Sequence, residues 1–354
     1  MTAASRALRV LVVDDSAVAR QTIALALSRA GMEVATVPDP IIALERVRTG
    51  PPDVLVLDLE MPRMDGLTLL GRLMRQSPLP VVVCSASTGP GSSAAVEALS
   101  RGAVAVVEKR SLGVAGAPEL VQLADAVRAA GGAAVRRASQ PRKPVAAPVV
   151  SAPRLAPSPD AVIAIGASTG GTSAIESLLC ALPYGAPPIL VVQHMPAGFT
   201  RALAERLDRE TPHAVREAVG GERLEPGLVL IAPGDRHLLL HRVQGALVAR
   251  LGDTQPVCRH CPSVDVLFRS VAEVAGGPRA TGVLLTGMGE DGAEGMLALR
   301  RTGAWTVAQD EATSVVFGMP AEAIRRGGVD EVLPLQGIAP ALSARAGRIA
   351  RHSR

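Results

Sequence analysis

Short apolar runs recur along this chain and alternate with longer segments that have helical spacing. The runs lie at 9–13, 54–57, 81–84 and 104–107 in the first half, and at 161–165, 189–192, 228–231 and 282–285 in the second. Runs this short and uniformly apolar are typical of strands buried on both faces of a parallel sheet. Their alternation with helices predicts an α/β fold with mostly parallel sheets in both halves.

A proline-rich segment separates the two halves. Between Ser139 and Pro159, six prolines stand among Ala, Val, Arg and Ser, with no periodicity that could bury one face. This composition is typical of an extended, semi-rigid spacer. Because 354 residues exceed one ordinary core, we expect two domains, 1–127 and 160–350, joined by a linker at 128–159.

The composition narrows the classes of function. Hydrophobic residues make up 48% of the chain but aromatic residues only 1%, so the cores must consist of Ala, Val, Leu and Ile. The 37 basic and 33 acidic residues form no basic stripe interleaved with aromatics, and we therefore expect no nucleic-acid binding. No segment reaches the ~18 apolar residues of a membrane helix, and the N-terminal run is too short for a signal peptide. We expect a cytoplasmic protein that is not inserted in a membrane.

Polar residues follow several strands of the predicted N-terminal sheet. Asp14 and Asp15 come directly after the first run, and Asp58 directly after the run at 54–57. In an open parallel sheet these carboxylates gather at the carboxyl edge, where ligands bind. Clustered carboxylates need a cation, and oxygen ligands with room for water and phosphate suit Mg²⁺. Ser85 and Lys109 follow two further strands and add a hydroxyl and an ammonium group suited to holding a phosphoryl group.

This N-terminal part resembles the receiver domain of two-component response regulators. The matching residues are Asp14-Asp15, Leu-Asp-Leu-Glu-Met-Pro-Arg-Met-Asp-Gly at 57–66, Ser85 and Lys109. The resemblance implies a flavodoxin-like, doubly wound parallel sheet with Asp58 as the phosphoacceptor and with Ser85 and Lys109 binding the phosphoryl group. It also implies Mg²⁺ bound by Asp14 or Asp15, by Asp58 and by the backbone carbonyl of Glu60.

Two positions depart from the receiver pattern. Arg110 stands where the family usually has a proline after the lysine, and Val106 stands where a switch aromatic is common. We expect phosphorylation of Asp58 to be retained, whereas these two residues do not follow the pattern by which the family transmits the signal through the receiver.

The second half begins with a glycine-rich turn around a serine. Gly-Ala-Ser-Thr-Gly-Gly at 166–171 follows the run at 161–165, and such a strand-to-helix turn can expose Ser168 at a sheet edge as a nucleophile. A dinucleotide-binding turn is disfavoured because Ser168 stands where that motif needs its second glycine. A helix N-cap is the other alternative, but Ser173 with Glu176 makes the better capping box.

A nucleophilic serine needs a base and a group that orients the base. His194 follows the run at 189–192, and Asp291 lies in the glycine-rich loop at 286–292, so both would converge on the edge that carries Ser168. Asp235 and His237 also follow an apolar run and offer a second arrangement. Asp291 could instead cap a helix with Glu294. Spacing alone leaves these alternatives open.

The second half also resembles the catalytic domain of chemotaxis protein-glutamate methylesterases, the CheB family. The matching motifs are Ile-Gly-Ala-Ser-Thr-Gly-Gly at 165–171, Gln-His-Met-Pro at 193–196, Ala-Pro-Gly-Asp at 232–235, Pro-Ser-Val-Asp-Val-Leu-Phe at 262–268, the loop at 286–292, and Val-Phe-Gly-Met-Pro at 316–320. The resemblance implies a Rossmann-like α/β hydrolytic domain with a mostly parallel sheet. It implies Ser168 as nucleophile, His194 as base and Asp291 as the orienting acid. Backbone N–H groups of Met288 and Thr169 would form the oxyanion hole, and the hydrolase would need no cofactor.

The two resemblances together imply an enzyme of chemotactic adaptation. It would demethylate glutamate γ-methyl esters on methyl-accepting chemoreceptors, deamidate certain glutamines, and be activated when a chemotaxis histidine kinase phosphorylates Asp58. Two rival readings are a binding module that has lost catalysis and an esterase of another signalling pathway. The Cys258 and Cys261 pair is a weak zinc signal without a second pair, and we assign it no function.

Overall fold

The computed structural model describes residues 6–62, 64–85, 90–109, 118–133 and 160–352. Contacts within the chain divide it into two compact units, Met1–Arg142 and Lys143–Arg354. Helix α5 continues to Gly131, beyond the domain end expected at 127, and most of the expected linker lies outside the described residues. The boundaries at 127 and 159 therefore stay predictions.

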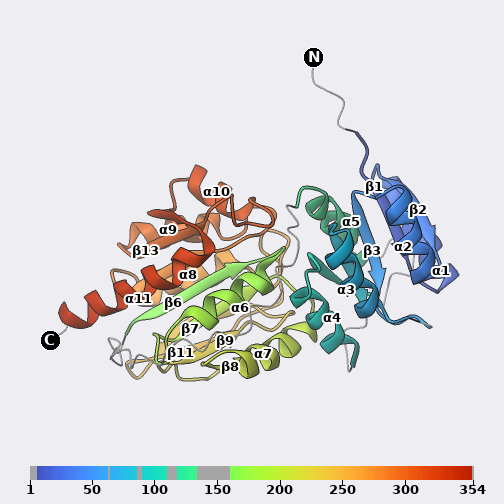
Figure 1. The fold of residues 1–354 in the computed structure, drawn as a ribbon. Coiled ribbons are helices and arrows are strands. Elements are labelled where there is room, and N and C mark those ends of the chain that lie inside the picture. The colour runs from blue at the N-terminus through green and yellow to red at the C-terminus, as the bar shows by residue number, and fades with distance from the viewer. Residues whose placement is uncertain (1–5, 63, 86–89, 110–117, 134–159, 353–354) are drawn as a thin grey trace, which may run out of the picture. The chain divides into compact units, whose positions relative to one another are not determined.

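The first unit is a five-stranded parallel sheet in the order β2-β1-β3-β4-β5 (Figure 1). Its strands are β1 (Arg9–Val13), β2 (Glu33–Val37), β3 (Val54–Asp58), β4 (Val81–Ser85) and β5 (Ala105–Glu108). Its helices are α1 (Ala17–Arg29), α2 (Pro40–Thr49), α3 (Gly66–Gln76), α4 (Pro90–Ser100) and α5 (Pro118–Gly131). Helices α1 and α5 pack together, as do α2, α3 and α4, which is the doubly wound arrangement expected from the sequence.

The second unit contains a seven-stranded parallel sheet in the order β14-β13-β12-β6-β7-β9-β8. The strands are β6 (Val162–Ala167), β7 (Ile189–Gln193), β8 (Ala214–Glu217), β9 (Leu228–Ile231), β12 (Ala280–Leu284), β13 (Trp305–Gln309) and β14 (Glu331–Leu333). The helices are α6 (Gly171–Ala181), α7 (Phe199–Glu210), α8 (Val264–Ala275), α9 (Ala293–Arg301), α10 (Met319–Arg325) and α11 (Leu335–His352). Helices α6, α7 and α11 form one layer, and α8, α9 and α10 form another. The central strand β6 is buried along its whole length.

An antiparallel hairpin, β10 (Leu238–Val243) and β11 (Ala246–Leu251), packs against α8 and is the exception to the parallel pattern. This hairpin is not among the strands expected from the sequence. Burial alternates along β11 with the period of two typical of a half-exposed sheet, and charged or polar residues, His241, Arg242 and Arg250, interrupt the apolar residues of the two strands. The strands turn at Gln244 and Gly245, both with positive φ.

The expected cap at Ser173 is wrong, and the alternative cap at Asp291 does not form. Helix α6 begins at Gly171 behind Gly170, which has a left-handed φ of 76°, so Ser173 and Glu176 do not form its start. Helix α9 begins behind Gly292, and Asp291 therefore does not cap it. Glycine at 171 lets α6 start close to the sheet, because a Cβ there would lie 2.6 Å from the Cβ of Ala167 and clash with the Gln193 side chain.

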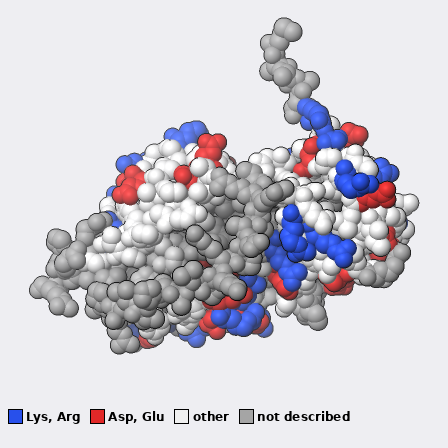
Figure 2. All heavy atoms as spheres, viewed as in Figure 1, with Lys and Arg blue, Asp and Glu red and all other residues white. Residues whose placement is uncertain are grey.

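The surface carries both signs of charge. On the face drawn in Figure 2, basic and acidic side chains occur on both units. None of the helices in the described part of the chain has the length and apolar character needed to span a membrane.

Candidate functional site

The ends of strands β6 and β7 bring Ser168 and His194 side by side. The register pairs Ala167 with Gln193, so the next residue of each strand lies at the same carboxyl edge of the sheet. Adjacent strands run about 4.8 Å apart. The His194 N–H donates to the carbonyl oxygen of Ala167 at 3.0 Å, and the Ser168 N–H donates to Thr286, beyond β12, at 3.0 Å. Hydrogen bonds thus join the end of the central strand β6, around Ser168, to the residues that follow its two neighbours, β7 and β12.

The buried side chain of Gln193 ties the backbone of these two residues together. Its amide Nε2 donates to the carbonyl oxygens of Ser168 at 2.9 Å and of His194 at 3.1 Å. Gln193 is only 3% exposed. No role was predicted for Gln193 from the sequence, where the signal is a polar residue at the end of an apolar run.

His194 pairs with the carboxylate of Asp291. Its Nε2 lies 2.8 Å from Asp291 Oδ2, which acts as acceptor, so the proton of the neutral ring belongs on Nε2. Its Nδ1 is buried and has no hydrogen-bond partner among the described residues. The neutral ring therefore presents an unpaired nitrogen lone pair at the sheet edge that carries Ser168.

Asp291 is held by the N-terminus of α8. Its Oδ1 accepts hydrogen bonds from Ser263 Oγ at 2.7 Å and Asp265 N–H at 3.1 Å, and its Oδ2 accepts one from Val264 N–H at 2.7 Å. Burial alone would raise the pKa of this carboxyl group, but the hydrogen bonds from His194, Ser263 and Asp265 outweigh it and the pKa is lowered. A helix N-terminus is a favourable place for a carboxylate, so Asp291 stays ionised next to His194.

The alternative built on Asp235 and His237 does not form a triad. His237 Nδ1 accepts a hydrogen bond from Ser263 N–H at 3.1 Å, and its Nε2 donates to the carbonyl oxygen of Gln255 at 2.8 Å. Both ring nitrogens are therefore used in hydrogen bonds to the backbone, and Nδ1 fixes Ser263, the residue that caps α8. His237 supports Asp291 through Ser263 and is not available as a base.

The loop after β12 runs past Ser168 at close range. Thr286 Oγ1 donates to the carbonyl oxygen of Thr169 at 2.9 Å, and a Cβ on Gly287 would lie 2.8 Å from the Cβ of Ser168. Among the described residues, none accepts a hydrogen bond from the backbone N–H of Thr169 or of Met288. Two donors near the serine are therefore left for a ligand.

The first unit gathers its acidic residues as expected. Carboxylate oxygens of Asp14, Asp15 and Asp58 all lie within 4.8 Å of one another. Lys109 Nζ forms ion pairs with Asp58 and, at 3.0 Å, with Asp14 Oδ2. The Glu60 N–H donates to Asp58 Oδ1 at 3.2 Å.

Burial governs the ionisation of this cluster. It raises the pKa of Asp58, with a further contribution from the charge of Asp14, and the bonds to Lys109 only partly oppose it. Burial also works to lower the pKa of Lys109, but its bonds to Asp58 and Asp14 prevail and the pKa is raised. A divalent cation would stabilise the ionised carboxylates and so offset the effect of burial on the pKa of Asp58.

The remaining receiver positions are less informative. Ser85 is fully buried at the end of β4, and Val106 is half-buried in β5. Arg110 lies outside the described residues.

Comparison with known proteins assigns both units. Residues 163–342 match the CheB methylesterase family, and residues 10–115 match the response regulator receiver domain. A protein-glutamate methylesterase/protein-glutamine glutaminase 1 of Anaeromyxobacter dehalogenans is 55% identical over 345 residues, which cover 95% of this chain and 98% of that protein.

The chain belongs to the CheB methylesterase family.

Further similarities agree with this assignment. A protein-glutamate methylesterase/protein-glutamine glutaminase 3 of Geobacter metallireducens is 50% identical over 94% of this chain and 97% of its own length. The crystal structure of the Thermotoga maritima CheB methylesterase catalytic domain aligns with a TM-score of 0.50 and 41% identity, over 51% of this chain and 96% of that one. The family and the two α/β domain types expected from the sequence are confirmed.

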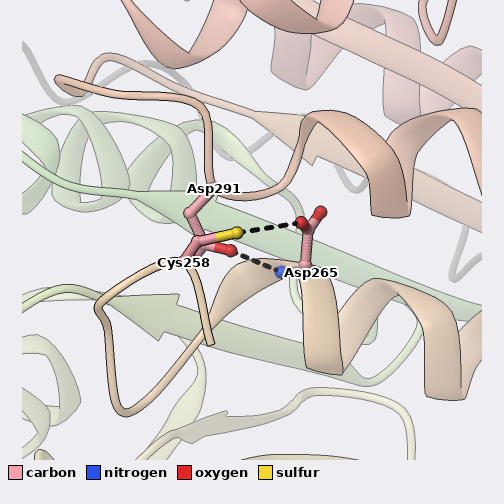
Figure 3. Close-up of side chains that lie close together, drawn as sticks. All are labelled: Cys258, Asp265 and Asp291. Carbon is pink, nitrogen blue, oxygen red and sulfur yellow. Dashed lines mark hydrogen bonds between the residues drawn. The ribbon is translucent and has the colours of Figure 1, made fainter. Parts of the chain in front are cut away.

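Cys258 of this CheB methylesterase domain lies beside the α8 N-terminus, but Cys261 does not join it. Figure 3 shows the Cys258 thiol directed at Asp265, to which it donates over 3.7 Å, while the Asp265 N–H donates to Asp291. Burial and the charges of Asp291 and Asp265 raise the pKa of Cys258 to about 11, so it is a protonated donor. Cys261 instead contacts the Asp253 carbonyl oxygen at 4.0 Å. The two thiols therefore do not act as a pair of ligands here.

Proposed function

We propose that the protein is a phosphorylation-activated serine hydrolase that removes methyl groups from glutamate γ-methyl esters of chemoreceptors and deamidates certain receptor glutamines. The observation that carries this proposal is the His194–Asp291 pair at 2.8 Å, with the unpaired Nδ1 of His194 at the sheet edge next to Ser168. The family membership supplies the class of ester, and the names of the relatives supply both activities.

Ser168 is the nucleophile of this reaction. Its hydroxyl oxygen attacks the ester carbonyl carbon while its proton passes to Nδ1 of His194. The oxyanion of the tetrahedral intermediate accepts hydrogen bonds from the N–H groups of Met288 and Thr169, and one such donor is typically worth about 3 kcal/mol. The imidazolium then protonates the leaving methoxide, methanol departs, and an acyl-serine remains.

Hydrolysis of the acyl-serine repeats these steps with water. His194 removes a proton from water, the hydroxide attacks the acyl carbon, and His194 returns the proton to Ser168 as glutamate is released. Deamidation follows the same course with ammonia as the first leaving group. Asp291 keeps the proton on Nε2 before each transfer and stabilises the imidazolium after it.

Phosphorylation of Asp58 controls the hydrolase in this proposal. The acceptor carboxylate takes a phosphoryl group from the histidine kinase of the pathway, and Lys109 and Ser85 bind the phosphoryl oxygens. The oxygen-only cluster of Asp14, Asp15 and Asp58 fits Mg²⁺, which would neutralise charge on the acceptor and the phosphoryl group. The backbone carbonyl of Glu60 would be a further ligand.

Methanol release from methyl-labelled chemoreceptor membranes tests the activity. We expect release that rises when Mg²⁺ and a small phosphodonor are added, and no release with the Ser168→Ala variant. Asp58→Asn should keep the basal rate and lose the stimulation. Stimulation that survives Asp58→Asn would contradict the control by Asp58.

A fluorophosphonate probe separates the esterase from its rivals. Labelling of Ser168 that depends on His194 would exclude a binding module without catalysis. Labelling of Ser168 without methanol release from receptors would point to an ester of another signalling pathway.

A further inference from the structure

A second histidine covers the ring of His194. The imidazole of His260 stacks on it with 3.8 Å between ring centroids and 8° between ring planes. Among the described residues, none exchanges a hydrogen bond with the His260 ring. Packing against His194 is therefore the ring interaction that the structure gives to this side chain.

A tight two-residue turn holds His260 in this place. Val257 and His260 exchange backbone hydrogen bonds of 2.9 and 3.0 Å, and the residues between them, Cys258 and Arg259, have φ of 50° and 67°. Positive φ at both central positions defines a type I′ turn, which non-glycine residues other than Asn and Asp rarely form. Such local strain persists where surrounding contacts fix it and is concentrated at functional sites.

The contact that fixes the turn is the thiol of Cys258. It donates to Asp265, whose own N–H donates to Asp291, as Figure 3 shows. The turn is thus anchored to the same helix end that holds the partner of His194. One end of α8 fixes both the edge of the His194 ring, through Asp291, and its face, through His260.

We propose that His260 is a positioning residue of the methylesterase, which clamps the face of the His194 ring so that Nε2 stays on Asp291 while Nδ1 is directed to Ser168. The inference rests on the proposed role of His194 as base. A hydrogen bond at one ring atom leaves the imidazole free to tilt about that bond, and a flat group stacked on its face removes this freedom. Proton transfer depends on such alignment.

The charges around His260 are compatible with this role. Burial lowers the pKa of His260 to about 3, with a further contribution from His194 and from Arg259, while the charge of Asp291 opposes them. His260 is therefore neutral at the pH at which an esterase works. A neutral ring adds no positive charge next to His194 when that residue becomes an imidazolium, and its π face attracts a cation.

The test is the rate at which a fluorophosphonate labels Ser168 in the full-length protein. This reaction reports on activation of the serine by His194 and needs no natural substrate. We expect His260→Ala to lower the labelling rate about 10- to 100-fold, in line with the cost of a small misplacement of a catalytic group. His260→Phe keeps a flat ring without hydrogen-bonding nitrogens and should restore most of the rate. In methanol release, the loss in His260→Ala should fall on kcat and leave KM nearly unchanged.

His213→Ala is the matched control, because His213 is a buried histidine of the same unit whose Nε2 contacts the Leu179 carbonyl oxygen away from the site. It should lose stability but keep the labelling rate. A wild-type rate in His260→Ala, or no recovery in His260→Phe when thermal unfolding shows both variants folded, would overturn the clamp. If receptors release no methanol while the labelling rates behave as expected, the proposed substrate fails and the clamp stands.

Discussion

Replacing Asp291 with asparagine should disturb the orientation of His194 while keeping a side chain of nearly the same size in the site. The carboxylate accepts four hydrogen bonds, from Ser263 Oγ, two N–H groups at the start of α8, and His194 Nε2. An amide has one acceptor oxygen and an NH₂ group that can only donate. If the oxygen keeps the bonds of Oδ1, the NH₂ group faces both His194 and the N–H of Val264.

The expected loss of activity follows from this reversal. A donor opposite Nε2 favours the tautomer with the proton on Nδ1, so the nitrogen that should accept the serine proton no longer has a lone pair. The same change in serine proteases lowers kcat about 10⁴-fold, or about 5 kcal/mol of transition-state stabilisation. The unsatisfied N–H of Val264 costs a further ~1–3 kcal/mol of folding stability.

The assay is kcat for methanol release together with the free energy of unfolding in urea. Asp330→Asn is the matched control, because Asp330 accepts hydrogen bonds from Arg300 Nε at 2.7 Å and from Thr306 N–H and Oγ1 at 3.0 Å, remote from the serine. It should lose a comparable amount of stability and keep its kcat. If Asp291→Asn stayed within about tenfold of the wild-type kcat, orientation of His194 by Asp291 would be refuted.

Three further outcomes are expected. A chelator of divalent cations should abolish stimulation by a phosphodonor and leave the basal methanol release unchanged, since the cation serves only Asp58; loss of the basal rate would contradict this. Gly287→Ala should lower both kcat and the melting temperature, because its Cβ would lie 2.8 Å from that of Ser168, whereas Gly337→Ala, in helix α11 with its nearest neighbour at 3.4 Å, should keep kcat and not lower the melting temperature. The lowered pKa of Asp291 stabilises the fold above the ordinary value of 3.8, and this contribution should disappear as pH falls through the folded pKa below it. In urea titrations across acidic pH, the free energies of unfolding of wild type and of Asp291→Asn should therefore approach each other only below the pKa of Asp291 in the folded protein.

The strands that position the chemistry could be predicted because they are buried on both faces. Apolar runs in the sequence mark seven of the strands, β1, β3, β4, β6, β7, β9 and β12. The register of parallel neighbours then brings the residues that follow these strands to one edge of each sheet. The edge strands β2 and β8 were not predicted, whereas the edge strand β5 was, as the run at 104–107, and the buried strand β13 was missed. β2 is mostly exposed, with Glu33 and Thr36 among its five residues, and in β8 buried and exposed residues alternate. Half-exposed strands contain too few consecutive apolar residues to be recognised.

The contacts between distant segments could not be read from spacing. Asp291 lies at the right place in the chain to cap α9, yet its carboxylate is bonded to the start of α8, because the helix start behind Gly292 needs no side-chain cap. His237 has the position expected of a catalytic histidine, but the tertiary fold uses both its ring nitrogens in hydrogen bonds to the backbone. The hydrogen bonds at the start of α8 decide between these roles. His260 gave no signal for the same reason.

The bonds that assemble the candidate site all lie within the second unit. Asp291, Gln193 and the loop after β12 hold His194 and Ser168 through residues that follow Lys143, and the hydrogen bonds between described residues that make this geometry are all internal to that unit. Phosphorylation of Asp58 is then expected to act on access of the receptor to the site rather than on its assembly. A small fluorophosphonate should label Ser168 at nearly the same rate with and without phosphodonor, while methanol release from receptors rises. Equal stimulation of both reactions would show instead that the receiver changes the alignment of the catalytic groups.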